Sequence, residues 1–364
     1  MKKYASAAVL VAAAALALSG CGAAPTDSST NTASTGSSTA ASNSTDFLAC
    51  MVSDAGGFDD KSFNQSGAAG LEQAVTDLGI TTKLVESDDG SDFAPNLTSL
   101  KAQNCGLTVT VGFNLSDATK AMAEANPDIK YAIVDDAAIE LPNVKSLVFK
   151  TSDASFLAGY AAAAYSKTGT VATFGGMNIP TVTIFMDGFV DGVARYNEDF
   201  SKDVKVLGWD KASQNGTFTG DFDDLSKGQN TATSFIDQGA DVIMPVAGPV
   251  GGGAAVAAQS HDGVAIIWVD TDGYVSAPEY KDLFLTSVVK EIPVAVYDTV
   301  KATVDGQFSA DPYIGTLANE GVGIAPFHDY EDQISQEVKD KLDQLKADIA
   351  DGTLEVTSIS DPAA

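Results

Sequence analysis

The sequence predicts an α/β protein made of two doubly wound lobes, each a parallel sheet with helices on both faces. Two observations support this prediction. Short apolar runs alternate with helical patterns from residue 47 onward, and strands separated by helices pair in parallel. The alternation restarts near residue 154, and the roughly 320 residues after the first 45 suffice for two domains of ordinary size.

The first lobe is predicted from the apolar runs before residue 150. Its expected strands are Phe47–Val52, Thr82–Glu86, Leu107–Val111, Tyr131–Val134 and Ser146–Phe149. Its expected helices are Gly67–Leu78, Phe93–Asn104 and Ser116–Ala125. Ser116 is suited to cap the last of these helices, because its hydroxyl can accept a bond from a free backbone N–H group.

The second lobe is predicted from the next series. Its expected helices are Ala154–Ser166, Thr181–Tyr196, Ser226–Gln238 and Ala254–Ser260. Its expected strands are Val171–Phe174, Val204–Trp209, Asp241–Pro245 and Ala265–Val269. The tail adds a strand, a helix, an extended segment and a charged helix at Leu283–Ser287, Ile292–Val304, Tyr313–Ala325 and Asp332–Asp351. These pieces are too few for a third domain, so we expect them to complete the two lobes, with a ligand site in the cleft between them.

The N-terminus has the pattern of an export signal. Two lysines precede an apolar run at Ala5–Leu18, which is too short to span a bilayer as a stable helix. The run ends in Leu-Ser-Gly-Cys at residues 18–21, which resembles the lipobox of bacterial lipoproteins. That resemblance implies cleavage after Gly20 and lipid on Cys21. Residues 1–20 would then be a lipoprotein signal peptide. The alternative is a plain secretory signal with an incidental cysteine.

Composition limits the partners. Residues 21–45 are rich in Ser, Thr, Ala, Asn and Gly, which cannot bury a core, so we expect a lipidated, flexible tether on the extracytoplasmic face of the cell membrane. The chain has 21 basic and 49 acidic residues and a formal net charge of −28. That charge argues against nucleic acid, and against anionic lipid as a direct partner of the folded part.

Two cysteines remain after Cys21. Cys50 lies in the first predicted strand, and Cys105 just precedes the strand at Leu107–Val111. An exported protein meets oxidising conditions, and neighbouring strands would allow a disulfide. Two buried free thiols are the alternative, because the spacing of the Cα atoms cannot be read from the sequence.

The loop after the first strand, residues 56–65, is the first candidate site. It combines two glycines with Phe58 and Phe63, several acids that include Asp60, and the amide Asn64. Loops at the carboxyl ends of parallel strands are where open α/β folds bind ligands. Aromatic rings beside carboxylates and amides suit a ligand with a flat ring and polar edges. An ordinary connecting loop with core phenylalanines is the alternative.

Other strand ends carry similar groups. They are Asp135-Asp136, the loop at residues 216–224 with Phe222, the glycine loop that starts at Gly248, and Asp270 with the later Lys290. In a closed cleft, Phe58 and Phe222 would sandwich an aromatic base. Asp135 or Asp136 would accept from ring nitrogens, and Asp270 and Lys290 would bind sugar hydroxyls. Acids also end strands as turn or cap residues, and a glycine loop also serves tight helix–strand packing.

Signatures of catalysis are scarce. The sequence contains neither the Gly-x-Ser-x-Gly pattern of a nucleophile elbow nor the His-Glu-x-x-His pattern of a zinc protease. The two histidines, His261 and His328, are too few for a metal cluster. We therefore expect no catalytic residue, no metal and no cofactor.

A family resemblance follows from the sequence Gly-Phe-Asp-Asp-Lys-Ser-Phe-Asn-Gln at residues 57–65. It resembles the opening motif of the basic-membrane-protein, or PnrA-like, family: nucleoside-binding lipoproteins of ABC transporters. Further segments match in the same order, so that the resemblance extends over nearly all of residues 47–330. They are FLAG at 156–159, GGMNIP at 175–180, DGF at 187–189, GADVI at 239–243, VDTD at 269–272, TSVVK at 286–290 and GVGIAP at 321–326.

The resemblance implies a type I periplasmic-binding-protein fold, in which three crossovers form a hinge between two doubly wound lobes. We expect the first lobe at residues 46–151 and 271–310, and the second at residues 152–270 and 311–358. The family also implies the site. Its residues would be Phe58 and Phe222 on the base, Asp135 or Asp136 reading the base, Asp270 and Lys290 on the ribose, and Asn64 and Gly248 as neighbours.

The sequence therefore predicts a monomeric, lipid-anchored receptor that captures nucleosides, with purine nucleosides favoured, and delivers them to the permease of an ABC importer. One alternative is a receptor for another flat or hydroxylated solute, such as a sugar or a signalling molecule. The other is an enzyme that processes nucleosides.

Overall fold

The computed structural model describes residues 46–362, which fall within one compact unit of the chain. The predicted signal, the lipid site at Cys21 and the tether lie outside the described residues. Between residues 46 and 362, no helix has both the length and the apolar character needed to cross a membrane.

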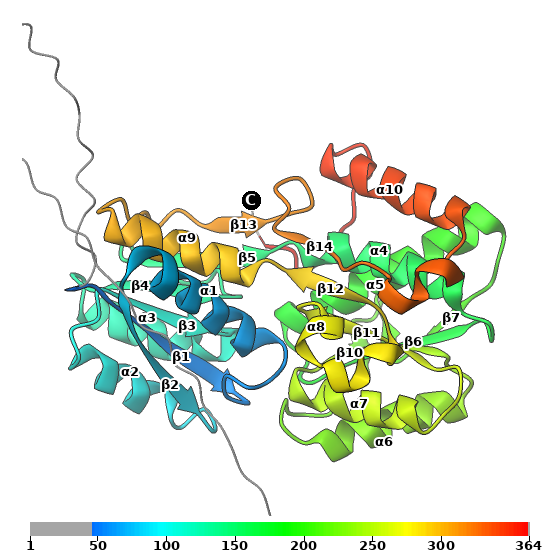
Figure 1. Ribbon diagram of the computed structural model, residues 1–364, viewed down its shortest axis with the longest axis horizontal. Helices are drawn as coiled ribbons and strands as arrows, with labels where there is room; N and C mark the ends of the chain where they lie inside the picture. The colour runs from blue at the N-terminus through cyan, green and yellow to red at the C-terminus, as the bar shows by residue number, and fades with distance from the viewer. Residues whose placement is uncertain (1–45, 363–364) are drawn as a thin grey trace, which may run out of the picture. The chain divides into compact units, whose positions relative to one another are not determined.

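The first sheet has six strands in the order β13-β5-β4-β3-β1-β2, and all its pairs are parallel. The strands are β1 (Leu48–Ala55), β2 (Thr81–Ser87), β3 (Leu107–Val111), β4 (Lys130–Val134), β5 (Val144–Phe149) and β13 (Tyr313–Gly315). Helices α1 (Phe63–Leu78) and α9 (Ile292–Val304) pack together on one face. Helices α2 (Phe93–Lys101) and α3 (Ser116–Ala125) cover the other face (Figure 1).

The second sheet also has six strands, in the order β14-β12-β11-β10-β6-β7. They are β6 (Thr170–Gly175), β7 (Lys205–Leu207), β10 (Val242–Val246), β11 (Ala265–Asp270), β12 (Phe284–Lys290) and β14 (Val322–Ile324). Only β14 runs antiparallel to its neighbour. A separate hairpin joins β8 (Trp209–Asp210) to β9 (Asn215–Gly216).

Helices cover this sheet on both faces (Figure 1). They are α4 (Thr151–Tyr165), α5 (Pro180–Phe200), α6 (Leu225–Asp237), α7 (Pro249–Gln259) and α8 (Gly273–Ser276), and α10 (Gln336–Ala350) packs on α4. Short 3₁₀ turns lie at η2 (Phe113–Leu115), η3 (Pro278–Leu283) and η4 (His328–Gln333). The alanine-rich α4 is buried almost all round, as expected of a helix without a polar face. It lies so close to α5 that a Cβ at Gly159 would come within 2.1 Å of the Phe189 carbonyl oxygen.

The chain crosses between the two sheets three times: from β5 to α4, from β12 to α9, and from β13 to β14. The three crossovers are therefore confirmed, but their positions differ from the expected boundaries. We assigned residues 271–310 to the first lobe, whereas β12 pairs with β11 in the second sheet. We assigned residues 311–358 to the second lobe, whereas β13 pairs with β5 in the first. An apolar pattern identifies a strand but not the sheet that receives it.

A disulfide joins Cys50 to Cys105, with 5.8 Å between the Cα atoms. Cys50 belongs to β1, and Cys105 lies two residues before β3, which pairs directly with β1. Of the two alternatives that the sequence left open, the structure contains the bonded one. The link closes a long loop, which by the chain-entropy argument destabilises the unfolded first lobe by about 4 kcal/mol.

Candidate ligand-binding site

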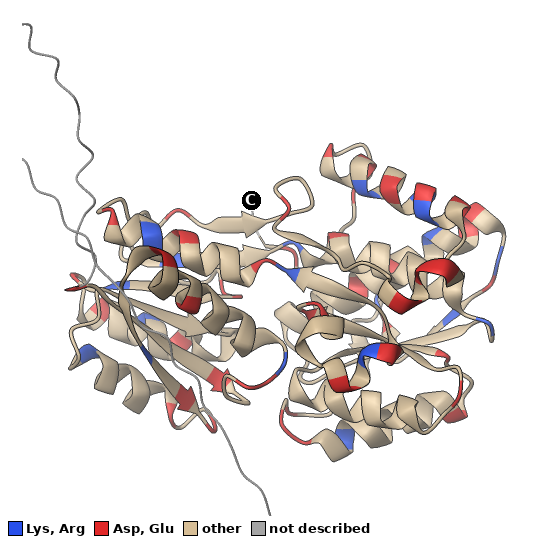
Figure 2. Cartoon of the chain, viewed as in Figure 1, with Lys and Arg blue, Asp and Glu red and all other residues tan. Residues whose placement is uncertain are grey.

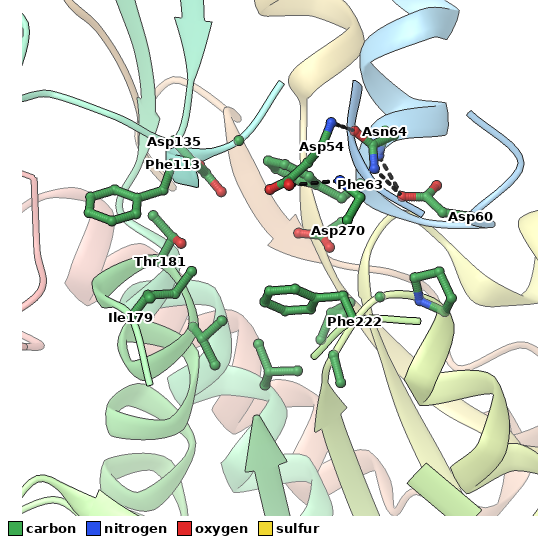
Figure 3. Close-up of a pocket in the computed structure, with 18 of the residues that line it drawn as sticks. Asp54, Asp60, Phe63, Asn64, Phe113, Asp135, Ile179, Thr181, Phe222 and Asp270 are labelled. Atoms are coloured by element: carbon green, nitrogen blue, oxygen red, sulfur yellow. Dashed lines mark hydrogen bonds between the residues drawn. The ribbon is translucent and has the colours of Figure 1, made fainter. Parts of the chain in front are cut away.

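A cavity lies where the carboxyl ends of the strands of both sheets face each other. Seven of the nine predicted ligand residues line it: Asp60, Asn64, Asp135, Phe222, Gly248, Asp270 and Lys290. Figure 3 shows that Asp135 of the first lobe and Phe222 and Asp270 of the second lie around the same space. The prediction that the cleft holds the candidate site agrees with this placement.

Phe58 does not take its expected place. It packs, half-buried, against the hydrophobic core, and its backbone N–H donates to the Glu86 carboxylate at 3.0 Å. Phe63, the first residue of α1, lines the cavity instead. The helix begins one residue after Ser62 and directs its first side chain toward the strand ends. The two phenylalanines belong to one loop, and the sequence alone could not fix which of them meets the cleft.

Asp60 holds the loop and the start of α1 together. Its carboxylate accepts the backbone N–H groups of Ser62, Asn64 and Gln65 at 3.0, 2.7 and 3.0 Å. These are N–H groups that the first turn of a helix leaves without partners, so Asp60 acts as a cap from just outside the helix. Burial raises the pKa of Asp60, and the three N–H groups oppose that shift.

Asn64 connects this cap to the end of β1. Its side-chain amide donates to Asp60 at 3.1 Å, and its oxygen accepts the backbone N–H of Asp54 at 2.9 Å. Asp54 also lines the cavity, and no pattern in the sequence distinguishes it from the other acids of the region. The Asn114 amide donates to its carboxylate at 3.2 Å. Burial raises the pKa of Asp54 to about 6, and the nearby charges of Asp223 and Asp60 add to the shift.

Lys290 lies between two carboxylates. Its Nζ atom is 2.6 Å from Asp135 Oδ2 and 2.9 Å from Asp270 Oδ1, and all three side chains are buried. Burial acts to lower the pKa of Lys290, but the two carboxylates outweigh it and raise that pKa above its ordinary value. Burial raises the pKa of Asp135 against the opposing charge of Lys290. The cluster places two carboxyl groups beside one ammonium, and their oxygens suit a ligand that donates hydrogen bonds.

The two acids of this cluster share a strained backbone. Asp135 follows β4 and Asp270 ends β11, and both have positive φ angles, of 62° and 70°. Non-glycine residues adopt this conformation rarely, and it occurs often at binding sites. Lys290 ends β12 at the crossover into α9, so the ion pair from Asp135 to Lys290 joins the first sheet to the second.

Asp136 does not line this cavity. Its carboxylate accepts the Ser116 hydroxyl at 3.0 Å and the Ala138 backbone N–H at 3.2 Å. It faces an adjoining cavity whose wall includes the C-terminal residues 359–362. Of the two neighbouring acids, Asp135 is therefore the one that lines the candidate site.

The second lobe contributes Phe222 and Gly248. The Phe222 ring lies against Gly176, where an added Cβ would come within 2.4 Å of the ring. The Phe222 carbonyl accepts the Val250 N–H of α7 at 3.3 Å. Gly248 precedes α7 with a positive φ of 50°. Further wall residues that were not predicted to bind the ligand include Phe113, Ile179, Thr181, Val182 and Phe185.

Comparison with known proteins identifies the family. The family model "ABC transporter substrate-binding protein PnrA-like" matches residues 47–360. The chain belongs to this family. It is similar to the ABC transporter nucleoside-binding protein BmpA of Lactococcus lactis, with 32% identity over 332 residues, or 86% of this chain and 90% of the relative. It is also similar to basic membrane protein A of Borreliella burgdorferi, with 32% identity over 310 residues, or 83% and 86% of the two chains.

Other relatives extend this result. An uncharacterized lipoprotein of Pyrococcus horikoshii is 31% identical over 283 residues, or 75% of this chain and 67% of the relative. Among solved structures, an ABC transporter solute-binding protein of Aeropyrum pernix K1 superposes with a TM-score of 0.78 at 25% identity, over 86% of this chain and 94% of that chain. The resemblance and the fold predicted from the sequence are thus confirmed. Like its PnrA-like family, the protein is a substrate-binding protein of an ABC transporter, a class that binds solutes rather than transforming them.

Proposed function

We propose that the protein captures nucleosides, with purine nucleosides favoured, and delivers them to the permease of an ABC importer. The observation that carries this proposal is the pair of phenylalanines, Phe63 from the first lobe and Phe222 from the second, that line one cavity with the buried Asp135–Lys290–Asp270 cluster. The relative named a nucleoside-binding protein supports it.

Each part of the cavity suits one part of a nucleoside. The two rings would hold the flat base between the lobes, where stacking adds to the burial of apolar area. Asp135 would accept from N–H groups on the base. Asp270 would accept from ribose hydroxyls, and Lys290 would donate to ribose oxygens while it balances the two carboxylates.

Asp54 adds a group with two protonation states. Because its pKa is about 6, it can accept a hydrogen bond when ionised and donate one when protonated, close to neutral pH. It would therefore tolerate either a donor or an acceptor on the ligand. This tolerance fits a receptor for several related nucleosides.

We further propose that the receptor is a monomer held at the extracytoplasmic face of the cell membrane by lipid on Cys21. The lipobox-like sequence at residues 18–21 and the relative named a lipoprotein support this. Figure 2 shows acidic residues over both lobes, so the folded part would be repelled by anionic lipid. The anchor and the tether, rather than the protein surface, would keep it at the membrane.

The test is thermal unfolding of protein comprising residues 46–364 with a panel of nucleosides, free bases and sugars. A ligand that binds only the folded state stabilises it by about 4 kcal/mol at a thousandfold excess over its dissociation constant. We expect stabilisation by inosine, guanosine or adenosine, and none by ribose or free base. Stabilisation by sugars alone would replace this proposal with the sugar receptor, and release of free base from bound nucleoside would replace it with an enzyme.

A further inference from the structure

Trp268 forms a hydrogen bond between the lobes beside the candidate site. It lies in β11, two residues before Asp270, and only 2% of its surface is exposed. Its indole Nε1 donates to the backbone carbonyl of Lys61, in the first-lobe loop, at 3.1 Å. Indole N–H is a donor without acceptor capacity, so it needs a partner of this kind when buried.

The indole ring is held in one orientation by its surroundings. A Cβ added at Gly273 would come within 2.7 Å of the Trp268 side chain, and one at Gly251 within 3.3 Å. The Phe284 ring lies on a third side, with 5.4 Å between ring centroids. Since the ring cannot turn in this space, the direction of its N–H is fixed by the second lobe alone.

The acceptor belongs to a segment that leads directly into the ligand site. Lys61 has a left-handed backbone with φ of 59°, and its ammonium pairs with Asp59 at the surface. The next residue, Ser62, is fully buried, and its hydroxyl lies 2.9 Å from Asp270 Oδ2 and 3.0 Å from the Val269 carbonyl. The residue after that is Phe63, which lines the cavity.

We propose that Trp268 is a positioning residue: its bond to Lys61 fixes the loop so that Ser62 meets Asp270 and Phe63 meets the ligand when the lobes are closed. This inference rests on the proposed function. Because donor and acceptor belong to different lobes, hinge opening separates them. The bond therefore stabilises the closed form selectively and slows release of the ligand.

The chain offers a matched control, because its other tryptophan makes a comparable bond inside one lobe. Trp209 is also buried, and its Nε1 donates to Asp187 at 2.8 Å within the second lobe. Replacing either tryptophan with phenylalanine removes one indole N–H bond and keeps an aromatic ring. Trp268→Phe breaks a bond between lobes, whereas Trp209→Phe breaks one that hinge motion leaves intact.

The experiment measures nucleoside dissociation by stopped flow and the dissociation constant by calorimetry, on protein comprising residues 46–364. For Trp268→Phe we expect an affinity about three- to tenfold weaker, mostly through faster dissociation, which corresponds to one buried hydrogen bond. For Trp209→Phe we expect a lower unfolding temperature with an affinity within about twofold of wild type. Equal effects of the two substitutions on dissociation would overturn the inference.

A second variant and a second readout complete the test. Ser62→Ala should also speed dissociation, and its effect should not add to that of Trp268→Phe, because the two residues act through one loop. Additive effects would contradict the proposed coupling. If wild type bound no nucleoside at all, the proposed function would fail. Solution scattering would then test whether the Trp268 bond holds the lobes together. A larger radius of gyration for Trp268→Phe, with that of Trp209→Phe unchanged, would support the inference, and equal radii would overturn it.

Discussion

Two loops bring a phenylalanine to the same cavity, and they are built in opposite ways. The first-lobe loop, residues 56–65, is held by buried groups, above all the Asp60 carboxylate with its three backbone N–H partners. In the second-lobe loop, residues 216–224, the backbone bonds to Gly175 and Gly176, but the side-chain bonds lie near water, where Asp221 accepts two backbone N–H groups and pairs with Lys227. Buried polar bonds are expensive to break, and exposed ones are replaced by water. The side-chain bonds therefore make the first loop a fixed platform, whereas those of the second loop hold it less firmly.

The largest expected effect tests this difference directly. Asp60→Ala leaves three backbone N–H groups without this partner, two of them buried, and should lower the free energy of unfolding by about 3–5 kcal/mol. Asp221→Ala removes a partly exposed carboxylate and should lower the free energy of unfolding by about 1 kcal/mol or less. Chemical denaturation measures both values. Equal losses would show that the two loops are held with similar strength.

A pH titration separates the acids of the two regions. Burial raises the pKa of Asp54 to about 6, whereas the Lys227 ammonium lowers the pKa of Asp221. A folded-state pKa above the unfolded value of about 4 means that folding favours the protonated carboxyl, so wild type loses stability as pH rises from about 4 to 7. Asp54→Asn removes this loss. Its free energy of unfolding should therefore rise by about 3 kcal/mol relative to that of wild type between pH 4 and pH 7.

Asp221→Asn is the control for the titration. The folded-state pKa of Asp221 is depressed, so its contribution to stability is present above its unfolded pKa and is lost as the pH falls through the folded-state pKa. As pH rises, the free energy of unfolding of Asp221→Asn should therefore fall relative to that of wild type, whereas that of Asp54→Asn rises. The change for Asp221→Asn should be smaller, because the group is partly exposed. A difference in the free energy of unfolding between wild type and Asp54→Asn that does not change with pH would contradict the raised pKa of Asp54.

Affinity measurements test which rings meet the ligand. Stacking on an aromatic ring contributes about 1–3 kcal/mol per base, so Phe63→Ala and Phe222→Ala should each weaken nucleoside binding by about tenfold to a hundredfold. Phe58→Ala is the matched control: it removes a ring of the same loop that packs outside the cavity, and should leave affinity unchanged. Calorimetry measures all three. A loss confined to Phe58→Ala would restore the role first inferred from the sequence.

These residues show how far the sequence could predict the site. The alternation of strands and helices predicted both lobes, and strand-end positions predicted Asp270 and Gly248, because the carboxyl edge of a parallel sheet is set by topology. Which of Phe58 and Phe63 faces the cavity depends on the residue at which helix α1 begins. Which of Asp135 and Asp136 faces it depends on the backbone orientation at the end of β4. These orientations are set by contacts that form only on folding: the Asp60 cap for the phenylalanines, and the bonds of Asp135 to Lys290 and of Asp136 to Ser116 for the acids.

The same reason explains the misplaced lobe boundaries. The composition of β12 and β13 would suit either sheet. The sheet that each joins depends on the strand with which it pairs, β11 for β12 and β5 for β13. Lys290 shows the consequence for the site. It ends β12 in the second sheet, so its bond to Asp135 crosses the lobe boundary, which the predicted boundaries would have placed inside one lobe.

The smallest expected effect concerns Lys227, which pairs with Asp221 at the surface of the second-lobe loop. Lys227→Ala should leave the unfolding transition unchanged within error and raise the pKa of Asp221, because solvent already screens the pair. Nucleoside affinity should also stay unchanged, since Phe222 is held by Gly176 and the Val250 N–H rather than by this ion pair. Calorimetry at low and high salt provides the measurement. A salt-dependent loss of affinity in wild type that disappears in Lys227→Ala would mean that the second loop is also a fixed platform, and the contrast between the two loops would be wrong.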